Sequence, residues 1–347
     1  MIVINGRFLS QRLTGIQRFA YEICCALQQI GMELVILAPE NIESAYDLSA
    51  LPVEIIGGKG SHFWEQVTLP RYMKRHYDGC LLLSLSGLSP LCYANSILTV
   101  HDVSYLLRPR SYSWLYCLYY QIMTPLAAKR AKKILTVSEF SKSEILRYIP
   151  VKPDQIEVVY NAVRAQERMP REKKAPYILT VASKVPRKNV KRLLEAYSTM
   201  PEPGFELYVA GGQNAIFADA GWSSVVHAPG IRFLGYVSED ELTRLYRDAT
   251  AYINPSLYEG FGIPLVEAMS QECPVLASDI PAFHEVCGDA ALYFDPMNAT
   301  DMQDKMRRIV QDEALRTKLQ KAGNEQLKRF SWTQSAQTIQ KIIRSLC

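Results

Sequence analysis

Short apolar runs alternate with amphipathic runs along the chain, and this alternation constrains the fold more than any other feature. Runs such as IVIN at residues 2–5 and SILTV at residues 96–100 are rich in aliphatic residues, as in strands buried on both faces. The stretch from Ile16 to Ile30 instead repeats its apolar residues at helical spacing and is followed by Gly31. The alternation predicts an α/β fold of doubly wound parallel sheets, with helices covering both faces of each sheet.

The chain is long enough for two such sheets, because single cores rarely grow to 347 residues. The polar stretch RAQERMPREKK, residues 164–174, interrupts the alternation and is the best linker candidate. We expect a Rossmann-like domain at 1–165, a second at 166–330 and a terminal segment at 331–347, with a ligand cleft at the carboxyl ends of the strands. The expected strands are IVIN, ELVILAP, CLLLSL, SILTV, KILTVS and IEVVY, then APYILTVA, FELYVAG, IRFLG, ATAYINP, PVLAS and AALYF.

Several classes of protein are excluded by composition. No apolar run reaches about 18 residues, so no transmembrane helix is expected. The start MIVINGRFLS looks like a first strand rather than a signal peptide, which predicts a cytoplasmic location. The 8 cysteines include no CxxC pair and no HExxH motif is present, so we expect reduced thiols and no metal site.

Positive charge is concentrated in the first half of the chain. Residues 1–165 carry 17 Lys and Arg against 13 Asp and Glu, whereas residues 166–347 carry 22 of each. Residues 103–138 hold six basic residues and no acidic one, together with the aromatic run SYSWLYCLYY. Rings beside lysines suit an anionic bilayer surface. The alternative is a helix with a buried aromatic face and a solvated basic end. Nucleic acid is disfavoured, because no nucleic-acid motif accompanies the patch.

Two acids bracket the turn in LYEGFGIPLVE, residues 257–267. The preceding ATAYINP reads as a strand, and Pro264 suits the first position of a following helix. Amides at such a turn hold phosphate oxygens. Carboxylates repel phosphate but accept hydrogen bonds from paired hydroxyls, so Glu259 and Glu267 suggest a ligand with a diphosphate between two polyols. Alternatively, Glu267 complements the helix dipole in the first turn and Glu259 is a solvated loop acid.

A cationic loop follows the strand in ILTVASKVPRKNV, residues 178–190. Lys184, Arg187 and Lys188 lie between this strand and a helix that Asn189 is expected to cap. Cations in such a loop neutralise a diphosphate, especially as it departs with increasing negative charge. Basic residues at the start of a helix are unfavourable, because they oppose the helix dipole. This cost favours a functional role for the cations, namely binding of an anionic ligand.

Two further pairs of residues in the first half of the chain are expected to face the cleft. Thr14 and Gly15 open the first helix, where a small residue lets a ligand approach the amides closely. His101 and Asp102 follow a strand in ILTVHDVSYL, and a histidine at the carboxyl end of a strand in an open sheet usually faces the ligand. The alternative is a structural histidine.

These motifs together resemble those of glycosyltransferase family 4. The resemblance covers nearly the whole chain and rests on TGIQRFA, TVHDVSY, VSEFSKSEI, VVYNAV, VASKVPRKN, FLGYVSEDEL and LYEGFGIPLVEAM, in this order. It implies the GT-B fold, in which the terminal segment 331–347, with SWTQSAQTIQKII, would be a helix that crosses back to the first domain. It also implies retaining transfer of a hexose from a nucleotide-diphosphate sugar without a metal cofactor. The branch resembles bacterial enzymes that build O-antigen or capsule, many of them mannosyl- or rhamnosyltransferases. It implies a saccharide or polyprenyl-linked acceptor, a cytoplasmic location at the inner face of the membrane and GDP-mannose as donor.

The resemblance also implies a role for each site residue. Glu267 would accept hydrogen bonds from the ribose, Glu259 would hold sugar hydroxyls and Lys188 would bind the diphosphate. His101 would touch the donor sugar and Gly15 would lie beside the phosphate and the acceptor, with Thr14 and Asp102 on the acceptor side. His101, Glu259 and Lys188 are the candidate catalytic residues. The remaining donor-site candidates are Lys184, Arg187, Tyr236, Val237, Gly260, Phe261, Gly262, Ile263, Pro264 and Leu265.

One departure from the family pattern concerns the second cation of the diphosphate site. The family often carries an arginine five residues before the lysine, where this chain has Ser183. Lys184 or Arg187 would then supply the charge. Two other functions stay open: a nucleotide-sugar epimerase of the same fold, and a sugar-nucleotide binding protein without catalysis. A dinucleotide dehydrogenase is disfavoured, because no GxGxxG follows the first strand.

Overall fold

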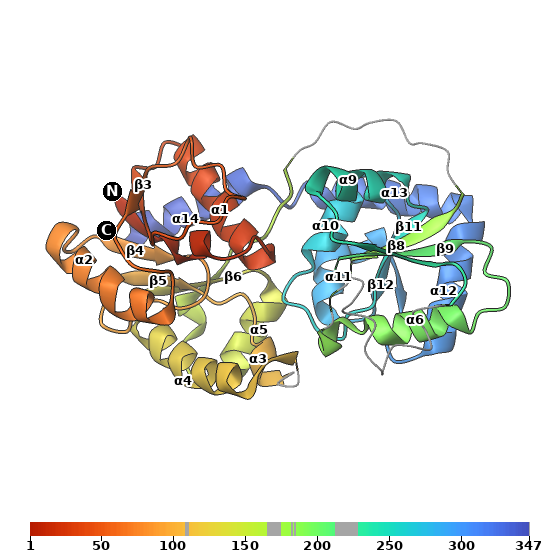
Figure 1. Cartoon of the computed structure of the whole chain (residues 1–347), viewed down its shortest axis with the longest axis horizontal. Coiled ribbons are helices and arrows are strands. Elements are labelled where there is room, and N and C mark those ends of the chain that lie inside the picture. Colours follow the sequence, from red (N-terminus) through yellow and green to blue (C-terminus); the bar gives the residue numbers. More distant parts are fainter. Residues whose placement is uncertain (108–110, 165–174, 182, 184, 212–227, 347) are drawn as a thin grey trace. The chain divides into compact units, whose positions relative to one another are not determined.

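The computed structural model describes residues 1–107, 111–164, 175–181, 183, 185–211 and 228–346 of the chain. These form two compact units (Figure 1). The first contains the described residues of Met1–Pro109, Ser113–Ala162 and Phe330–Cys347, and the second those of Arg110–Tyr112 and Val163–Arg329. Apart from Arg164, the expected linker at 164–174 lies outside the described residues.

The first unit is built on a fully parallel seven-stranded sheet. All side chains of its central strands β1 and β4 are buried, as expected for a parallel sheet covered on both faces. In spatial order the strands are β3 (Val53–Ile55), β2 (Leu34–Ala38), β1 (Ile2–Asn5), β4 (Leu81–Ser84), β5 (Ser96–Thr99), β6 (Lys133–Thr136) and β7 (Ile156–Val158).

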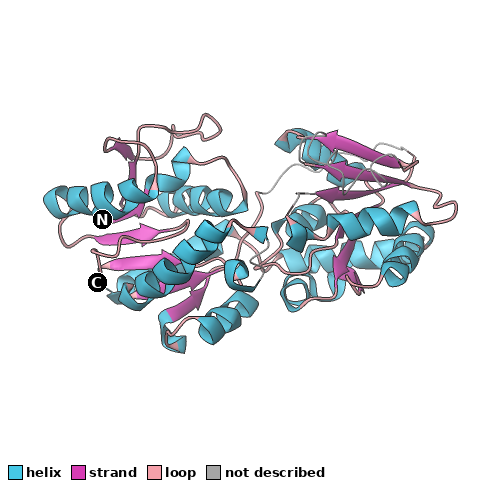
Figure 2. Cartoon of the chain, turned by 60° about the horizontal axis from the view of Figure 1, so that its bottom comes forward, coloured by secondary structure: helices cyan, strands magenta, loops and turns pink. Residues whose placement is uncertain are grey.

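Helices cover both faces of this sheet (Figure 2). The last helix, α14 (Trp332–Leu346), packs against α1 (Gly15–Gln29), although the preceding helix in the sequence belongs to the second unit. A single π-helical turn, η2 (Trp64–Thr68), leads into α2 (Leu69–His76). The other elements of the unit are η1 (Gly6–Ser10), α3 (Ser104–Leu107), α4 (Trp114–Arg130), α5 (Glu139–Tyr148) and η4 (Pro153–Gln155).

The second unit is built on a fully parallel six-stranded sheet. Its core joins buried residues of the strands to apolar faces of α6 (Val190–Ser198) and α12 (Ala299–Gln311). In spatial order the strands are β10 (Ile231–Gly235), β9 (Glu206–Ala210), β8 (Tyr177–Val181), β11 (Ala251–Asn254), β12 (Val275–Ser278) and β13 (Ala291–Phe294). The other elements are η5 (Pro186–Lys188), α9 (Glu239–Asp248), α10 (Ile263–Ser270), α11 (Pro281–Cys287), η6 (Gly288–Ala290) and α13 (Glu313–Leu327).

Each sheet has one topological switch point, where the chain changes the direction in which it adds strands. In the first sheet the switch lies between β1 and β4, and in the second between β8 and β11. Ligands of open α/β sheets bind beyond the carboxyl ends of the strands at such points. The loops that follow β8 and β11, and those that follow β1 and β4, are therefore the candidate ligand-binding loops.

All of the strand predictions are confirmed, and one strand among the described residues was missed. Each of the predicted apolar runs contains a strand of the structure. The missed strand is β3, which is only 3 residues long, has Glu54 at its centre and lies at the edge of the sheet, so it shows no buried apolar run. Among the described residues, no helix is long and apolar enough to cross a membrane, and no three His, Cys, Asp or Glu side chains are grouped for a metal ion.

Candidate functional site

The two loops predicted to carry the site lie together at the switch point of the second sheet. The cationic loop follows β8 and the acidic loop follows β11, and these two strands are hydrogen-bonded neighbours. Backbone contacts join the loops directly, since Leu257 N donates to Arg187 O at 2.8 Å. The Arg187 guanidinium also donates to Tyr258 O at 3.1 Å. The fold therefore brings residues about seventy positions apart in sequence into one cluster.

Glu259 lies at the centre of this cluster and is paired with both cations. Its Oε2 accepts a hydrogen bond from Arg187 at 2.9 Å, and its Oε1 accepts one from the Lys188 ammonium group. The Ser256 hydroxyl donates to the same Oε1 at 2.8 Å. Two positive charges and one negative charge leave the cluster with a net charge of about +1, which favours an anionic ligand.

The electrostatics of Glu259 show why it stays ionised although it is buried. Burial alone would raise the pKa of its carboxyl group. Lys188, Arg187 and the hydrogen bond from Ser256 outweigh burial and lower the pKa to about 2. The carboxylate is therefore fully charged at neutral pH and holds both cations in place.

This arrangement refines the expectation that Glu259 holds sugar hydroxyls. A carboxylate accepts about four hydrogen bonds, and Lys188, Arg187 and Ser256 supply three of them. One acceptor position is left for a ligand hydroxyl. The structure thus assigns Glu259 a task that the sequence did not reveal, namely fixing the two cations. The alternative that Glu259 is a solvated loop acid is wrong, since the residue is only 7% exposed.

The turn before α10 depends on glycine at position 262. Gly262 has φ of +105°, in the region that disfavours side chains. A Cβ atom there would lie 2.8 Å from a ring carbon of Phe283 and 3.0 Å from a methyl carbon of Leu265. The chain therefore makes a tight turn at Gly262, directly before the first residue of α10.

We expect Gly262→Ala to destabilise the second unit by more than the ~1–2 kcal/mol of the backbone conformation alone, because the Phe283 ring must also move. Gly204→Ala is the matched control, since Gly204 has φ of +71° and no atom within 4 Å of its would-be Cβ. Urea unfolding of both variants measures the difference. An equal loss in the free energy of unfolding in both variants would show that the turn accommodates a side chain at position 262.

Glu267 is the fifth residue of α10 and lies beyond its first turn. The alternative that it complements the helix dipole from the first turn is therefore wrong. The Tyr246 hydroxyl on α9 donates to Glu267 Oε2 at 3.1 Å. Burial, together with the negative charge of Glu267, raises the pKa of Tyr246, so this hydroxyl keeps its proton. Tyr246 orients Glu267, and the tyrosine was not singled out from the sequence.

Two local predictions around the site need correction. Pro264 is the second residue of α10, one position later than expected. Asn189 precedes α6 as predicted, but it adopts a left-handed conformation with φ of +56°, and its side chain does not cap the helix. Asn189 Nδ2 donates instead to Pro296 O at 2.8 Å, which anchors the start of α6 to the loop after β13. Lys184 lies outside the described residues, whereas Arg187 is the cation seen beside Lys188.

Tyr236 and Val237 follow β10 at the edge of the second sheet. One strand, β9, separates β10 from β8, which Lys188 follows, and two strands, β9 and β8, separate β10 from β11, which Glu259 follows. The Tyr236 side chain is 73% exposed. An exposed ring at the carboxyl end of a strand in this sheet suits the stacking of a planar base.

The predicted residues of the first unit lie near the carboxyl ends of its strands. Gly15 begins α1 and, like Thr14, is exposed. Phe19 of α1 packs edge-on against His101 with ring centroids 5.0 Å apart. Asp102 accepts hydrogen bonds from the amide of Ser104 at 2.8 Å and from its hydroxyl at 2.5 Å, so Asp102 caps a local turn.

His101 is half-buried, and one of its ring nitrogens is already engaged. Nε2 lies 2.9 Å from Leu85 O, and a carbonyl oxygen only accepts, so Nε2 carries the proton. Burial lowers the pKa of His101 despite the opposing effects of Leu85 and Asp102. The ring is therefore neutral at pH 7, and Nδ1 is an acceptor.

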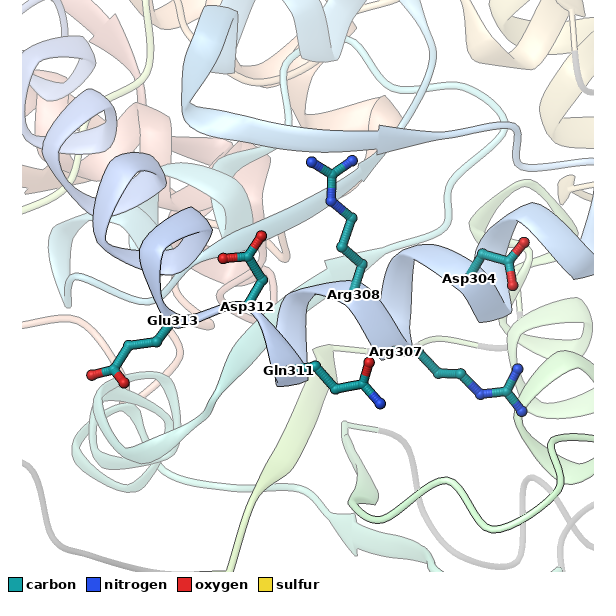
Figure 3. Close-up of a pocket in the computed structure, with 6 residues that line it drawn as sticks. All are labelled: Asp304, Arg307, Arg308, Gln311, Asp312 and Glu313. Atoms are coloured by element: carbon teal, nitrogen blue, oxygen red, sulfur yellow. The ribbon is translucent and has the colours of Figure 1, made fainter.

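One surface hollow of the second unit contains none of the predicted residues. It lies where α12 meets α13 and is lined mainly by charged side chains (Figure 3). Its lining holds both positive and negative side chains and includes no hydroxyl group and no aromatic ring. The lining residues are Asp304, Arg307, Arg308, Gln311, Asp312 and Glu313.

Two family models match the sequence, and their matches overlap at residues 164–167. Residues 13–167 match the model described as Glycosyltransferase Family 4, and residues 164–326 match Glycosyl transferases group 1. The second match contains β8 and β11, the strands that flank the switch point of the second sheet.

Similar curated proteins are named as mannosyltransferases. O-antigen chain mannosyltransferase B of Escherichia coli is 32% identical over 255 residues, which cover 68% of this chain and 67% of that protein. O-antigen chain mannosyltransferase RfbU of Salmonella typhimurium is 34% identical over 222 residues, covering 62% of this chain and 61% of the relative.

Solved structures share the fold over the full length. WaaG, a glycosyltransferase involved in lipopolysaccharide biosynthesis, superposes with a TM-score of 0.77 at 16% identity and covers 99% of both chains. Anabaena Alr3699/HepE in complex with UDP and glucose superposes with a TM-score of 0.74 at 15% identity, again over 99% of both. At these identities the likeness concerns the fold alone.

Proposed function

This chain belongs to glycosyltransferase family 4, and from that premise we propose that it transfers mannose from GDP-mannose to a saccharide of a cell-surface polysaccharide, with retention of configuration. Membership makes it a transferase with two Rossmann-like parallel-sheet units, the GT-B fold. The choice of mannose and of O-antigen or capsule synthesis is supported by the names of the relatives.

The observation that carries the proposal is the cluster at the β8–β11 switch point. A net positive pair, Arg187 and Lys188, lies beside a glycine turn that opens α10. Cations and helix-opening amides are the groups that hold a diphosphate. Glu267 supplies a carboxylate for the ribose hydroxyls, and Tyr236 a surface for the base. In this assignment the nucleotide extends from the edge strand β10 towards α10.

The same groups favour the chemical step. As the bond between sugar and diphosphate breaks, negative charge grows on the leaving diphosphate. Lys188 and Arg187 are held in position by Glu259 before the reaction, so they stabilise that charge without reorganising. The remaining acceptor position of Glu259 would hold a hydroxyl of the mannosyl group. No metal is assigned a role, because the side chains supply the positive charge.

In the first unit, Thr14, Gly15, His101 and Asp102 are assigned to the acceptor side. Neutral His101, with Nδ1 as an acceptor, suits contact with a sugar hydroxyl rather than with a phosphate. The acceptor is proposed to be a saccharide or a polyprenyl-linked saccharide, and its hydroxyl would attack on the face that the diphosphate leaves.

A thermal-shift panel of nucleotide-sugars tests the donor assignment, because a ligand that binds only the folded chain raises the melting temperature. We expect the largest rise with GDP-mannose. Glu267→Gln should require about 10- to 100-fold more GDP-mannose for the same rise, since it loses a charged hydrogen bond to the ribose. Glu195→Gln, an exposed carboxylate on α6, is the control. No shift with any nucleotide-sugar would contradict the proposal.

A second experiment separates transfer from epimerisation. The chain is incubated with donor and acceptor lipid, and mannose found on the lipid supports transfer.

Helix α4 supports a further part of the proposal, contact with an anionic bilayer. Leu115, Leu118, Ile122 and Leu126 are exposed and recur at spacings of three and four residues, so they form one stripe on α4. Exposed Lys129 and Arg130 end the helix. An exposed apolar stripe of this kind marks an interaction surface, and the adjacent cations favour anionic headgroups. We assign this surface to the inner face of the cell membrane, where polyprenyl-linked acceptors would be met.

We expect the chain to pellet with vesicles of phosphatidylglycerol at low salt and to be released as salt screens the basic residues. The double variant Leu118→Ser/Ile122→Ser should pellet less. Met297→Gln removes an exposed apolar side chain of the second unit and should pellet like the unmodified chain. Absence from the pellet at low salt would exclude the membrane role.

A further inference from the structure

A second cluster of polar side chains lies at the switch point of the first sheet. Asn5 is the last residue of β1, and its Nδ2 donates to Glu65 Oε1 at 2.8 Å and to Ser84 Oγ at 3.4 Å. Ser84 is the last residue of β4, so Asn5 bridges the two strands that flank the switch point. Glu65 thus lies at the position where open sheets of this class bind ligands.

Glu65 is fully buried and forms an ion pair with Arg7, whose side chain is almost fully buried. Arg7 NH1 donates to Glu65 Oε2 at 2.6 Å, and their side chains are 7% and 0% exposed. Arg7 Nε has no hydrogen-bond partner among the described residues. A buried ion pair of this kind often costs more in lost hydration than its attraction returns, so it seldom persists for stability alone. The pair therefore suggests a functional constraint.

The backbone that carries Glu65 is unusual. Residues Trp64–Thr68 form a π-helical turn. Such turns are rare and appear frequently at functional sites, where they redirect a side chain. Here the turn places Glu65 against Arg7 and leaves His62, just before it, at the border between the cluster and solvent.

His62 connects the buried ion pair to an aromatic surface. Arg7 NH1 lies 2.9 Å from His62 Nδ1, and an arginine only donates, so Nδ1 accepts and Nε2 carries the proton. The imidazole lies 4.4 Å from the Tyr119 ring and 5.9 Å from the Tyr120 ring of α4, measured between centroids. The His62 side chain is 42% exposed, so a ligand can reach it.

The charges of the cluster decide which class of ligand it fits. Arg7 and Glu65 cancel, in contrast to the net positive cluster of the second unit, so the site has no net attraction for a phosphate. A half-exposed N–H donor beside tyrosine rings instead suits a neutral ligand with hydroxyl groups along one edge and C–H bonds on one face. Saccharides have this composition: the rings pack on the C–H face, and the polar groups bind the hydroxyls.

We propose that His62 and Tyr119 bind the acceptor saccharide at the β1–β4 switch point, with Arg7 and Glu65 as positioning residues that fix His62. Arg7 sets the tautomer that makes Nε2 a donor, and Glu65 holds Arg7. This subsite rests on the proposed function, since it supplies the acceptor for the transfer. It lies entirely within the first unit.

The test measures saccharide binding separately from donor binding. The full chain with bound GDP is applied to an array of bacterial-surface and mannose-terminated saccharides. We expect His62→Ala and Tyr119→Ala to weaken binding by about tenfold or more, the loss of a hydrogen bond or of a stacked ring. His76→Ala removes a ring stacked on Tyr72 of α2, outside the cluster, and should bind like the unmodified chain. The thermal shift with GDP-mannose should stay unchanged in all variants.

The positioning role has its own readout. In spectra of ¹⁵N-labelled histidine, His62 of the unmodified chain should show a protonated Nε2 and an unprotonated Nδ1. Arg7→Lys keeps the charge opposite Glu65 but loses the planar fork, so a mixture of His62 tautomers and weaker saccharide binding are expected. Retention of a single tautomer in Arg7→Lys would overturn the positioning role.

The subsite is overturned if no saccharide on the array binds, or if His62→Ala binds as tightly as the unmodified chain. An equal loss in His76→Ala would overturn it as well, because the effect would then be unspecific. Failure of GDP-mannose to shift the melting temperature counts instead against the proposed function. The two failures are distinguishable, because the donor site and the subsite belong to different units.

Discussion

Lys188→Ala is expected to lower kcat for mannosyl transfer by about 10²–10⁴-fold while the fold stays intact. The ammonium group is paired with Glu259, which lies in the turn before α10 that is proposed to receive the diphosphate. Removing a charge that stabilises a leaving group typically costs several kcal/mol of transition-state stabilisation. Transfer from GDP-mannose to a polyprenyl-linked saccharide measures kcat, and thermal unfolding shows whether the variant is folded.

Lys191→Ala is the matched control for this variant. Lys191 lies three residues further along, in α6, and its partner is Glu195 on the helix surface, with both side chains about half exposed. We expect kcat close to that of the unmodified chain, because surface pairs of this kind contribute little. A folded Lys188→Ala enzyme with near-normal turnover would remove Lys188 from the site.

Glu259→Gln should also reduce turnover by orders of magnitude, for a different reason. The amide keeps the shape of the side chain but no longer neutralises Arg187 and Lys188, so both cations lose their fixed positions. Because Lys188 and Glu259 are in contact, the double variant with Lys188→Ala should lose less than the product of the two single effects. Independent, multiplicative losses would contradict a shared role.

The same variant has a pH signature in stability. The pKa of Glu259 is lowered to about 2 in the folded chain, below the value of about 4.3 for an unfolded glutamate. Its ionisation thus contributes about 3 kcal/mol to folding above pH 4.3, and this contribution is lost as the pH falls towards 2.

The free energy of unfolding of Glu259→Gln should therefore approach that of the unmodified chain as the pH is lowered through this window. Urea unfolding at a series of pH values measures it, with Glu195→Gln as the exposed control. A difference that does not change with pH would show that Glu259 is not held by the two cations.

The sheets and the positions of the loops that follow β8 and β11 could be predicted from the sequence. A strand buried on both faces leaves a continuous apolar run, and β11, for example, is buried at every position. The glycine and proline around Gly262 mark a tight turn before a helix, and the structure requires that glycine for steric reasons. Each of these signals depends on residues that are adjacent in the sequence, so it can be recognised without the structure.

Pairings between distant residues left no such signal. Glu259 binds Arg187, 72 positions away, and Glu65 binds Arg7, 58 positions away. Nothing near Glu65 in the sequence distinguishes it from a surface acid, because the π-helical turn that buries it has no clear sequence pattern. Asn189 was misjudged for a related reason: its αL backbone and its bond to Pro296 depend on a loop that follows a different strand.

A crystal structure of the chain with bound GDP-mannose is the most direct measurement. We expect the diphosphate between the start of α10 and the cations Lys188 and Arg187, the ribose hydroxyls on Glu267 and a mannosyl hydroxyl on Glu259. Electron density for the nucleotide anywhere other than the β8–β11 switch point, with the Lys188–Glu259 pair untouched, would contradict the assignment.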